Sequence, residues 1–309
     1  MRLVRGWRTL LPGPTVAAGA RADRWLLAVT VVLVGLGIVM IYSASAIRAQ
    51  DRFDDPMFFL KKQAVWAALG LLAMVWAVTW DLKRFQRATP LVFLASLLLL
   101  LLVLMPGIGI KINGARRWLR LFALSFQPAE LAKLAVVMFL ASYFARRQDR
   151  LDSFLDGFLP PLLMTGIPAG LIIVQPNFGT TVVLLVTALV MFYVGNARIS
   201  HLCATVAAGV PGLLFLMWMA PHGRARLLAL WNPSQVSARA TYQLDQSFYA
   251  LGPGGWLGLG LGNSMQKLFF LPEPHNDFIF AIVGEELGFV GTLAVVGLFT
   301  LFLWRGVRA

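Results

Sequence analysis

The stretch Trp25-Leu-Leu-Ala-Val-Thr-Val-Val-Leu-Val-Gly-Leu-Gly-Ile-Val-Met-Ile-Tyr42 contains no charged side chain. Its length is close to the roughly 20 apolar residues that an α-helix needs to cross the hydrocarbon layer of a membrane. Seven further apolar runs follow along the chain, at residues 63–80, 90–105, 131–144, 158–174, 178–194, 199–220 and 278–304. This pattern predicts an all-α, multi-pass membrane protein in which eight helices cross the bilayer.

The composition agrees with a membrane protein. Hydrophobic residues make up 59% of the 309 residues, charged residues make up 13%, and the mean hydropathy is +0.74. A net charge of +13 is also typical of nucleic-acid-binding surfaces. All Lys and Arg residues except Lys133, however, lie outside the apolar runs, where they would meet lipid headgroups. We therefore expect a membrane as partner and no nucleic acid.

The basic N-terminal segment sets the expected orientation. Residues 1–24, rich in Arg, Gly and Pro, predict a flexible cytoplasmic tail, and residues 25–309 predict a single transmembrane domain. The positive-inside rule favours this orientation, because four of the Lys and Arg residues expected outside lie in the long segment 221–276, which the rule discounts. Basic residues before the first run, and Ser43-Ala-Ser-Ala46 after it, resemble a signal peptide, but seven further runs favour a retained anchor.

Three carboxylates lie at and within the last apolar run. Asp277 ends the extended stretch Leu271-Pro-Glu-Pro-His-Asn-Asp277, and with Asn276 as N-cap we expect it in the first turn of the last helix. There it could act as a base or simply complement the helix dipole. Glu285 and Glu286 would lie roughly 12 to 14 Å deeper and point about 100° apart, which favours structural pairing. Ionisable groups in a membrane span are functional candidates.

A cationic segment precedes the fourth run. Residues 107–128 contain Lys111, Arg116, Arg117 and Arg120 with no acidic residue. Beyond them, Glu130 and Lys133 are spaced i, i+3 and would be neighbours on one helical face. Two interpretations stay open at this point. The pair neutralises itself, or Lys133 joins the arginines in gripping phosphate oxygens of a lipid-linked substrate, inside one outward-facing cavity shared with Asp277.

The remaining motifs exclude several chemistries. The glycine-rich residues 252–262 could let backbone approach a ligand closely, but no βαβ unit flanks them as a nucleotide site requires. The three histidines, at positions 201, 222 and 275, lack metal-ligand spacing, and the single Cys203 cannot form a disulfide within one chain. We therefore expect no metal site closed by side chains, and the sequence identifies no cofactor. A divalent cation, Mg²⁺ or Mn²⁺, bridging substrate phosphates is compatible with the sequence.

Five motifs in order carry a family resemblance. They are Asn113-Gly-Ala-Arg-Arg-Trp118, Phe126-Gln-Pro-Ala-Glu-Leu-Ala-Lys133, Tyr242-Gln-Leu-Asp-Gln-Ser247, Gly260-Leu-Gly-Asn-Ser-Met-Gln-Lys267, and residues 271–280 continuing through Gly284-Glu-Glu-Leu-Gly288. Together they resemble the SEDS family of shape, elongation, division and sporulation proteins. The forms of the last two motifs resemble its division members more than its elongation members. Ala129, Asn276 and Phe122 stand where the family usually has Ser, Thr and Gly.

The resemblance implies a function and partners. It implies a glycosyltransferase of septal peptidoglycan synthesis that polymerises lipid II at the outer face of the bacterial cytoplasmic membrane. A class B penicillin-binding protein and other division proteins would be its partners. The family has ten spans, so we expect this chain to be truncated at its C-terminus. Two alternatives stay open from the residues alone, a flippase for lipid-linked precursors and a non-catalytic division scaffold.

The resemblance also implies roles for individual residues. Asp277 matches the essential aspartate of the family and is the expected base. The expected substrate-binding residues are Arg116, Arg117, Gln127, Glu130, Lys133, Gln246, Ser247, Lys267 and Glu273. Trp118, Glu285 and Glu286 are expected to shape the cavity.

Overall fold

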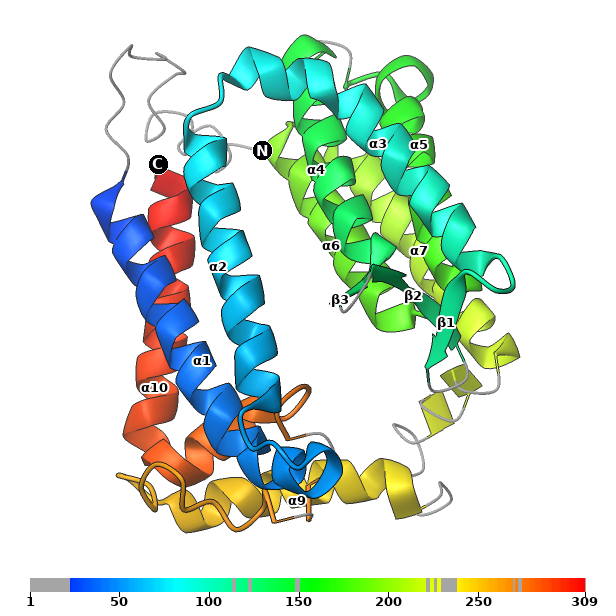
Figure 1. The fold of residues 1–309 in the computed structure, drawn as a ribbon. Coiled ribbons are helices and arrows are strands. Elements are labelled where there is room, and N and C mark those ends of the chain that lie inside the picture. Colours follow the sequence, from blue (N-terminus) through cyan, green and yellow to red (C-terminus); the bar gives the residue numbers. More distant parts are fainter. Residues whose placement is uncertain are drawn as a thin grey trace. The chain divides into compact units, whose positions relative to one another are not determined.

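The computed structural model describes residues 23–112, 115–121, 124–147, 151–220, 223–224, 227–228, 238–268, 270–271 and 274–308 (Figure 1). Within them, seven helical segments are long and apolar enough to cross a membrane, and a shorter apolar helix joins them. They are α1 (Arg24–Phe53), α2 (Phe58–Val78), α3 (Leu82–Leu104), α4 (Pro128–Arg147), η3 (Phe154–Phe158) continuing into α5 (Leu159–Val174), α7 (Ile199–Met219), α10 (Ile279–Arg308) and the shorter α6 (Phe178–Val194). The predicted multi-pass helical class is confirmed.

The chain divides into two compact units. The first comprises Met1–Ala73 and Tyr242–Ala309, and the second comprises Met74–Thr241. In the first unit α1 and α10 lie side by side (Figure 1). Met40 and Ala44 of α1 pack with Ile282 and Val295 of α10 in its hydrophobic core. The two helices that are farthest apart in the sequence therefore form one packed pair.

The second unit is built around α4. Ala129, Ala132 and Ala135 follow one another at intervals of three residues and are completely buried. Small side chains at this spacing let two helix backbones approach closely, which is how helices commonly pack inside membranes. Phe93 and Leu100 of α3 meet this face, and residues of α5 and α6 complete the core. Glu130 and Lys133 thus belong to a helix with a completely buried face.

A small antiparallel sheet lies between α3 and α4, which the all-α prediction did not include. Its strands are β1 (Gly109–Ile112), β2 (Ala115–Leu121) and β3 (Leu124–Phe126), in the order β1-β2-β3. Apolar and basic residues alternate in β1 and in the second half of β2, as they do in half-exposed strands. A Cβ at Gly109 would lie 1.9 Å from the carbonyl oxygen of Val103, so only glycine lets the sheet start this close to α3.

The last helix differs from the expected continuous span. Gly288 has φ 67° and ψ −166°, so α10 consists of two helical pieces, 279–287 and 289–308. The long segment before it also contains a helix, α9 (Ala238–Gly254). The first helix is also longer than expected, since α1 continues to Phe53, whereas the apolar run that predicts it ends at Tyr42. Glu285 and Glu286 both lie in the first piece of α10, just before the break.

Candidate active site

The glycine-rich segment is bonded to the backbone of α10 at its break. In a continuous helix the carbonyls of Glu285 and Glu286 would accept from the N–H groups of residues 289 and 290. Instead they accept from the N–H groups of Leu259 and Gly260, at 3.0 and 2.9 Å. The displaced N–H groups of residues 289 and 290 donate to the carbonyls of residues 255 and 256, at 2.9 and 3.1 Å. The break in the helix therefore leaves none of these four groups without a partner.

Glycines make this close approach feasible. A Cβ at Gly258 would lie 2.2 Å from the carbonyl oxygen of Glu286, and a Cβ at Gly288 would lie 2.3 Å from the nitrogen of Gly258. Both residues also have positive φ, which glycine adopts most readily. The sequence suggested that this backbone could approach a ligand. Among the described residues it approaches α10 instead, so the glycines serve packing within the chain.

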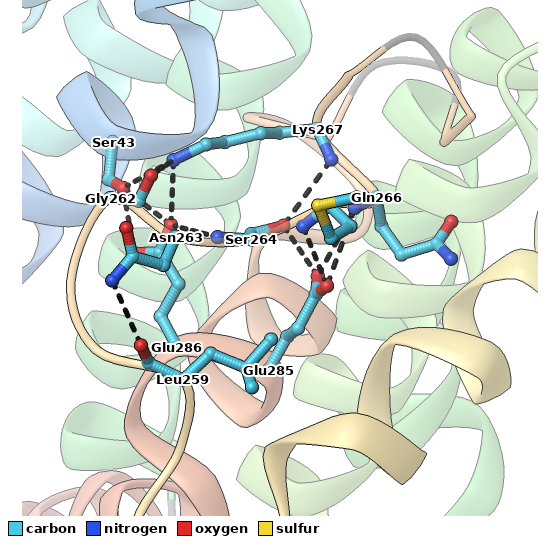
Figure 2. Close-up of polar contacts among 10 residues, drawn as sticks. Ser43, Leu259, Gly262, Asn263, Ser264, Gln266, Lys267, Glu285 and Glu286 are labelled. Atoms are coloured by element: carbon cyan, nitrogen blue, oxygen red, sulfur yellow. Dashed lines mark hydrogen bonds and ion pairs between the residues drawn. The ribbon is translucent and has the colours of Figure 1, made fainter.

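Glu285 binds the chain that follows the glycine-rich segment (Figure 2). Its carboxylate accepts from the backbone N–H of Met265 at 2.8 Å and from the Ser264 hydroxyl. A weaker contact of 3.4 Å reaches the N–H of Gln266. The Glu285 residue is only 1% exposed. Burial of a carboxylate is tolerated when several donors compensate the lost water, as they do here.

Glu286 points to different partners, as neighbouring helical positions should. It accepts from the Ser43 hydroxyl of α1 at 2.7 Å and pairs with the Lys267 ammonium group at 3.0 Å. The Lys267 ammonium group also donates to the carbonyl of Gly262. Glu286 is completely buried, and Lys267 is 5% exposed. We refer to Ser43, Ser264, Lys267, Glu285 and Glu286 as the buried polar cluster (Figure 2).

These contacts favour a structural role for Lys267, which the family resemblance suggested as a substrate-binding residue. Its charge is compensated by Glu286, and its side chain lies inside the first unit. The contacts of Glu285 and Glu286 agree with the structural pairing that their positions predict. The buried polar cluster ties the segment after α9 to α1 and to the first piece of α10.

Asp277 lies in the turn that precedes α10. The sequence predicts it in the first helical turn with Asn276 as N-cap, but α10 begins at Ile279 and residues 274–278 form turns. Pro274 and His275 are buried, whereas Asp277 is exposed. Among the described residues, its carboxylate has no ion pair. Asp277 is therefore an accessible carboxylate on a turn whose preceding residues are anchored.

Two contacts hold that turn. The guanidinium group of Arg48, which is 7% exposed, donates to the carbonyl of Leu271 at 3.2 Å. The His275 ring lies against the Phe59 ring, with 4.3 Å between centroids. Arg48 belongs to α1 and Phe59 to α2, so both helices help to fix the approach to Asp277.

In the second unit, Arg117 connects the sheet to the link between α5 and α6. Its guanidinium group donates to the carbonyl of Gln175 at 3.0 Å and to the carbonyl of Pro176. The Gln175 side chain in turn donates to the carbonyl of Leu100 at 3.1 Å. This chain of bonds gives Arg117 a structural function. Its expected contact with substrate phosphate stays a prediction.

The other expected residues of the second unit lie nearby in the chain. Lys133 and Glu130 form the i, i+3 ion pair that their spacing predicts, at 2.8 Å. The Lys133 side chain is 29% exposed, so it keeps access to solvent. Arg116 lies opposite Lys111 across β1 and β2, which places two like charges together. Trp118 on β2 and Gln127 before α4 are half-buried.

The expected site residues thus fall into two sets. Asp277, Lys267, Glu285 and Glu286 belong to the first unit, together with Gln246 and the buried Ser247 of α9. Arg116, Arg117, Trp118, Gln127, Glu130 and Lys133 belong to the second. Glu273 lies outside the described residues. The single cavity that would contain both sets stays a prediction.

Two members of the site were missed by sequence reasoning. Ser43 is part of a small-residue pattern that resembles a cleavage site, and Arg48 lies between the first and second apolar runs. Both belong to the last turns of α1, where they face residues more than 220 positions away. The sequence signal that could have identified them is the presence of polar residues at the end of an otherwise apolar helix. Its partner could not be named from sequence.

A metal site made by side chains has no support in the described part of the chain. No group of three or more His, Cys, Asp or Glu residues there is arranged to hold an ion. A divalent cation that bridges substrate phosphates stays a prediction.

The fold and the site define a multi-pass membrane protein that presents an exposed carboxylate on a turn braced by buried polar contacts. The family model described as "Cell cycle protein", which covers FtsW, RodA and SpoVE, matches residues 24–309. The chain belongs to this family.

Curated relatives and solved structures agree with this membership. The chain is 41% identical to stage V sporulation protein E of Bacillus subtilis, over 93% of this chain and 78% of that protein. It is 42% identical to the probable peptidoglycan glycosyltransferase FtsW of Nitrosococcus halophilus, over 92% of this chain and 73% of that protein.

Among solved structures, a chain from work titled "Structural coordination of polymerization and crosslinking by a peptidoglycan synthase complex" matches with a TM-score of 0.72 at 29% identity. The match covers 92% of this chain and 76% of that chain. RodA of Thermus thermophilus matches with a TM-score of 0.63, also at 29% identity, over 92% of this chain and 73% of that one. The helical architecture is thus shared with proteins of the same family.

Proposed function

We propose that the chain polymerises lipid II with Asp277 as general base, at the outer face of the bacterial cytoplasmic membrane. By family membership the chain is a peptidoglycan glycosyltransferase, as its relatives are named. The observation that carries the role of Asp277 is its position. It is an exposed carboxylate on a turn anchored by Arg48 and His275. A base must be accessible and held in place.

The reaction is an inverting glycosyl transfer. The 4-hydroxyl oxygen of the acceptor GlcNAc attacks C1 of the donor MurNAc, and the bond from C1 to the pyrophosphate oxygen breaks. Asp277 takes the hydroxyl proton, and undecaprenyl pyrophosphate leaves with the bonding electrons. The product has a β-1,4 linkage. A positioned general base typically contributes about 10²- to 10⁴-fold to such a step.

The leaving group gathers negative charge, so cations must stabilise it. Lys133 and Arg116 are the strongest candidates, because both keep partial exposure in the second unit. Lys267 is less suited, because it is only 5% exposed and its ion pair with Glu286 is buried, whereas Lys133 keeps access to solvent beside Glu130. We propose that these cations and Asp277 act on the same lipid-linked substrate. Gln127, Gln246, Ser247 and Glu273 would supply further polar contacts.

A septal role and a partner complete the proposal. The motif forms that resemble division members favour septal synthesis during cell division. The solved complex of similar structure is described as coordinating polymerisation and crosslinking. A class B penicillin-binding protein is therefore the partner that we propose for crosslinking the new glycan chains.

Transport of lipid-linked precursors has weaker support. A transport path would continue with polar side chains beyond the two glutamates. In α10, residues 289–304 contain no ionisable side chain. The hydroxyls of Thr292 and Thr300 donate to carbonyls of their own helix, at 2.8 Å each. The features of α10 therefore favour a site that is closed beneath the buried polar cluster.

The test is polymerisation of purified lipid II by the full-length protein reconstituted with its class B penicillin-binding protein. Asp277→Asn should lower the rate of glycan formation by at least about 100-fold, because the base is lost. Asp51→Asn is the matched control, since Asp51 is also exposed and lies in the first unit. Glycan chains formed at an undiminished rate by a folded Asp277→Asn protein would contradict the assignment. Lipid II translocation in vesicles that cannot polymerise would favour the flippase.

A further inference from the structure

A groove of about 360 Å³ lies in the second unit between α3, α4 and α5. It opens where α3 begins and α4 ends, and no residue of the proposed active site lines it. We propose that this groove binds an anionic phospholipid, with the lipid phosphate at Arg146 and Arg147 and an acyl chain along Phe139 and Met164. The site goes beyond the proposed glycosyl transfer and does not depend on it.

The lining of the groove has a basic part and an apolar part, which match the phosphate and the acyl chain of a phospholipid. Arg146 and Arg147 form the exposed rim at the end of α4. Further into the membrane span, Phe139 and Met164 form an apolar wall and are half-buried. Tyr143 lies between the two regions, and its hydroxyl donates to the carbonyl of Gly157 at 3.1 Å. An aromatic ring with one polar end is typical of the headgroup level of a bilayer.

The charge of the rim favours an anion. Among the described residues neither Arg146 nor Arg147 forms an ion pair with a carboxylate, and the Arg147 guanidinium group lies 5.4 Å from the centre of the Tyr143 ring. A neighbouring hollow that shares Arg147 contains Asp152, but Asp152 pairs with Arg198 at 3.1 Å. The other carboxylate that lines this neighbouring hollow, Asp156, accepts from the Ser153 hydroxyl at 3.4 Å. The two arginines are thus available to a phosphate, which guanidinium groups bind well.

A proline in α3 adds an acceptor for the headgroup. Pro90 has no N–H, so the carbonyl of Gln86 lacks its usual donor one turn later. Gln86 and Pro90 both line the groove. A glycerol headgroup has hydroxyls that can donate to such a carbonyl, whereas a choline headgroup has no donor. Phosphatidylglycerol therefore fits this lining better than phosphatidylcholine.

The proposed orientation places the groove where anionic lipids gather. With the N-terminal tail in the cytoplasm, the start of α3 and the end of α4 lie at the cytoplasmic leaflet. Basic segments at that leaflet are attracted by its negative surface. Lys83 and Arg84 are exposed at the same end of α3 but do not line the groove. They provide a control for attraction that depends on charge alone.

The test measures lipid binding to the delipidated full chain by native mass spectrometry. Dioleoyl phosphatidylglycerol should bind at least about tenfold more tightly than dioleoyl phosphatidylcholine. The double variant Arg146→Gln, Arg147→Gln should lose this preference, whereas Lys83→Gln, Arg84→Gln should keep most of it. Ser142→Phe, which leaves the charges and fills the groove, should weaken both lipids. Soluble glycerophosphoglycerol should not compete at equal concentration, because it lacks the acyl chains.

Three outcomes would overturn the proposal. Equal binding of the two lipids would remove the anion preference. A larger loss in Lys83→Gln, Arg84→Gln than in Arg146→Gln, Arg147→Gln would assign the preference to the surface of α3. Tighter binding of dioleoyl phosphatidylethanolamine than of dioleoyl phosphatidylglycerol would assign the groove to a zwitterionic lipid.

Discussion

Lys267 and Glu286 form an ion pair of 3.0 Å in which both side chains are almost completely removed from solvent. Lys267 follows the glycine-rich segment, and Glu286 lies in the first piece of α10. Breaking a buried pair by removing one partner leaves an uncompensated charge, which typically costs about 3 to 5 kcal/mol. The stability of the first unit should therefore depend strongly on keeping both members of this pair.

Removing only one charge of this pair should destabilise the protein strongly. Lys267→Met should lower the free energy of unfolding by about 3 kcal/mol, because Glu286 then stays buried without its cation. Lys267→Met combined with Glu286→Met should be more stable than Lys267→Met alone, since no charge is left unpaired. Thermal unfolding in detergent measures both effects. A double variant that is less stable than Lys267→Met would contradict the argument.

The Ser43 hydroxyl should contribute more to stability than the neighbouring Ser45 hydroxyl. Ser43 donates to the Glu286 carboxylate, and hydrogen bonds to charged groups contribute about 1.5 to 3 kcal/mol. Ser45 is also buried, but among the described residues its hydroxyl has no partner. Ser43→Ala should therefore lower the melting temperature clearly, and Ser45→Ala should change it little. Equal shifts in the two variants would show that Ser43 contributes no specific bond.

Gly258 should tolerate alanine far less well than Gly262 does. Both glycines have almost the same positive φ, +82° and +83°, so the backbone strain of about 1 to 2 kcal/mol is shared. At Gly258 a Cβ would also meet the Glu286 carbonyl oxygen at 2.2 Å, whereas at Gly262 nothing lies within 4 Å. Comparing the unfolding free energies of Gly258→Ala and Gly262→Ala isolates the effect of this contact. Similar losses would indicate that the backbones need not approach so closely.

Asp23 should make stability depend on pH. Burial raises the pKa of Asp23, but hydrogen bonds from the Leu26 and Trp25 N–H groups and from Arg305 outweigh it, so the pKa is below its usual 3.8. A carboxylate with a lowered pKa stabilises the folded state above its unfolded pKa. This contribution is lost as pH falls through the lower, folded pKa.

Asparagine at position 23 separates the two functions of Asp23. Asn can still cap α1, as Asp23 does through the N–H groups of residues 25 and 26, but it cannot pair with Arg305. Asp23→Asn should therefore remove part of the acid sensitivity, and Asp23→Ala should lose the cap as well. Unfolding measured from about pH 6 down to about pH 3 checks both variants. An identical pH dependence in wild type and Asp23→Asn would rule out the ion pair as its source.

Some of the site could be read from the order of residues because it depends on local spacing. Glu130 and Lys133 are three residues apart in a helix, and their ion pair follows from that spacing. Glu285 and Glu286 are adjacent, so their different directions also follow. The sheet at residues 109–126 was missed because its short strands lie in a segment that we interpreted by charge alone. Its alternation of apolar and basic residues was the signal.

The sequence by itself determined the class of the protein. Long runs without charge must be helices that satisfy their own backbone within lipid, so eight apolar segments can be named from the order of residues alone. Only the tertiary structure decided the partners of the charged residues. Ser43 and Glu286 are 243 positions apart, and the break at Gly288 is stabilised by backbone groups of residues 255–260. Such contacts depend on how helices pack, and local spacing carries no information about them.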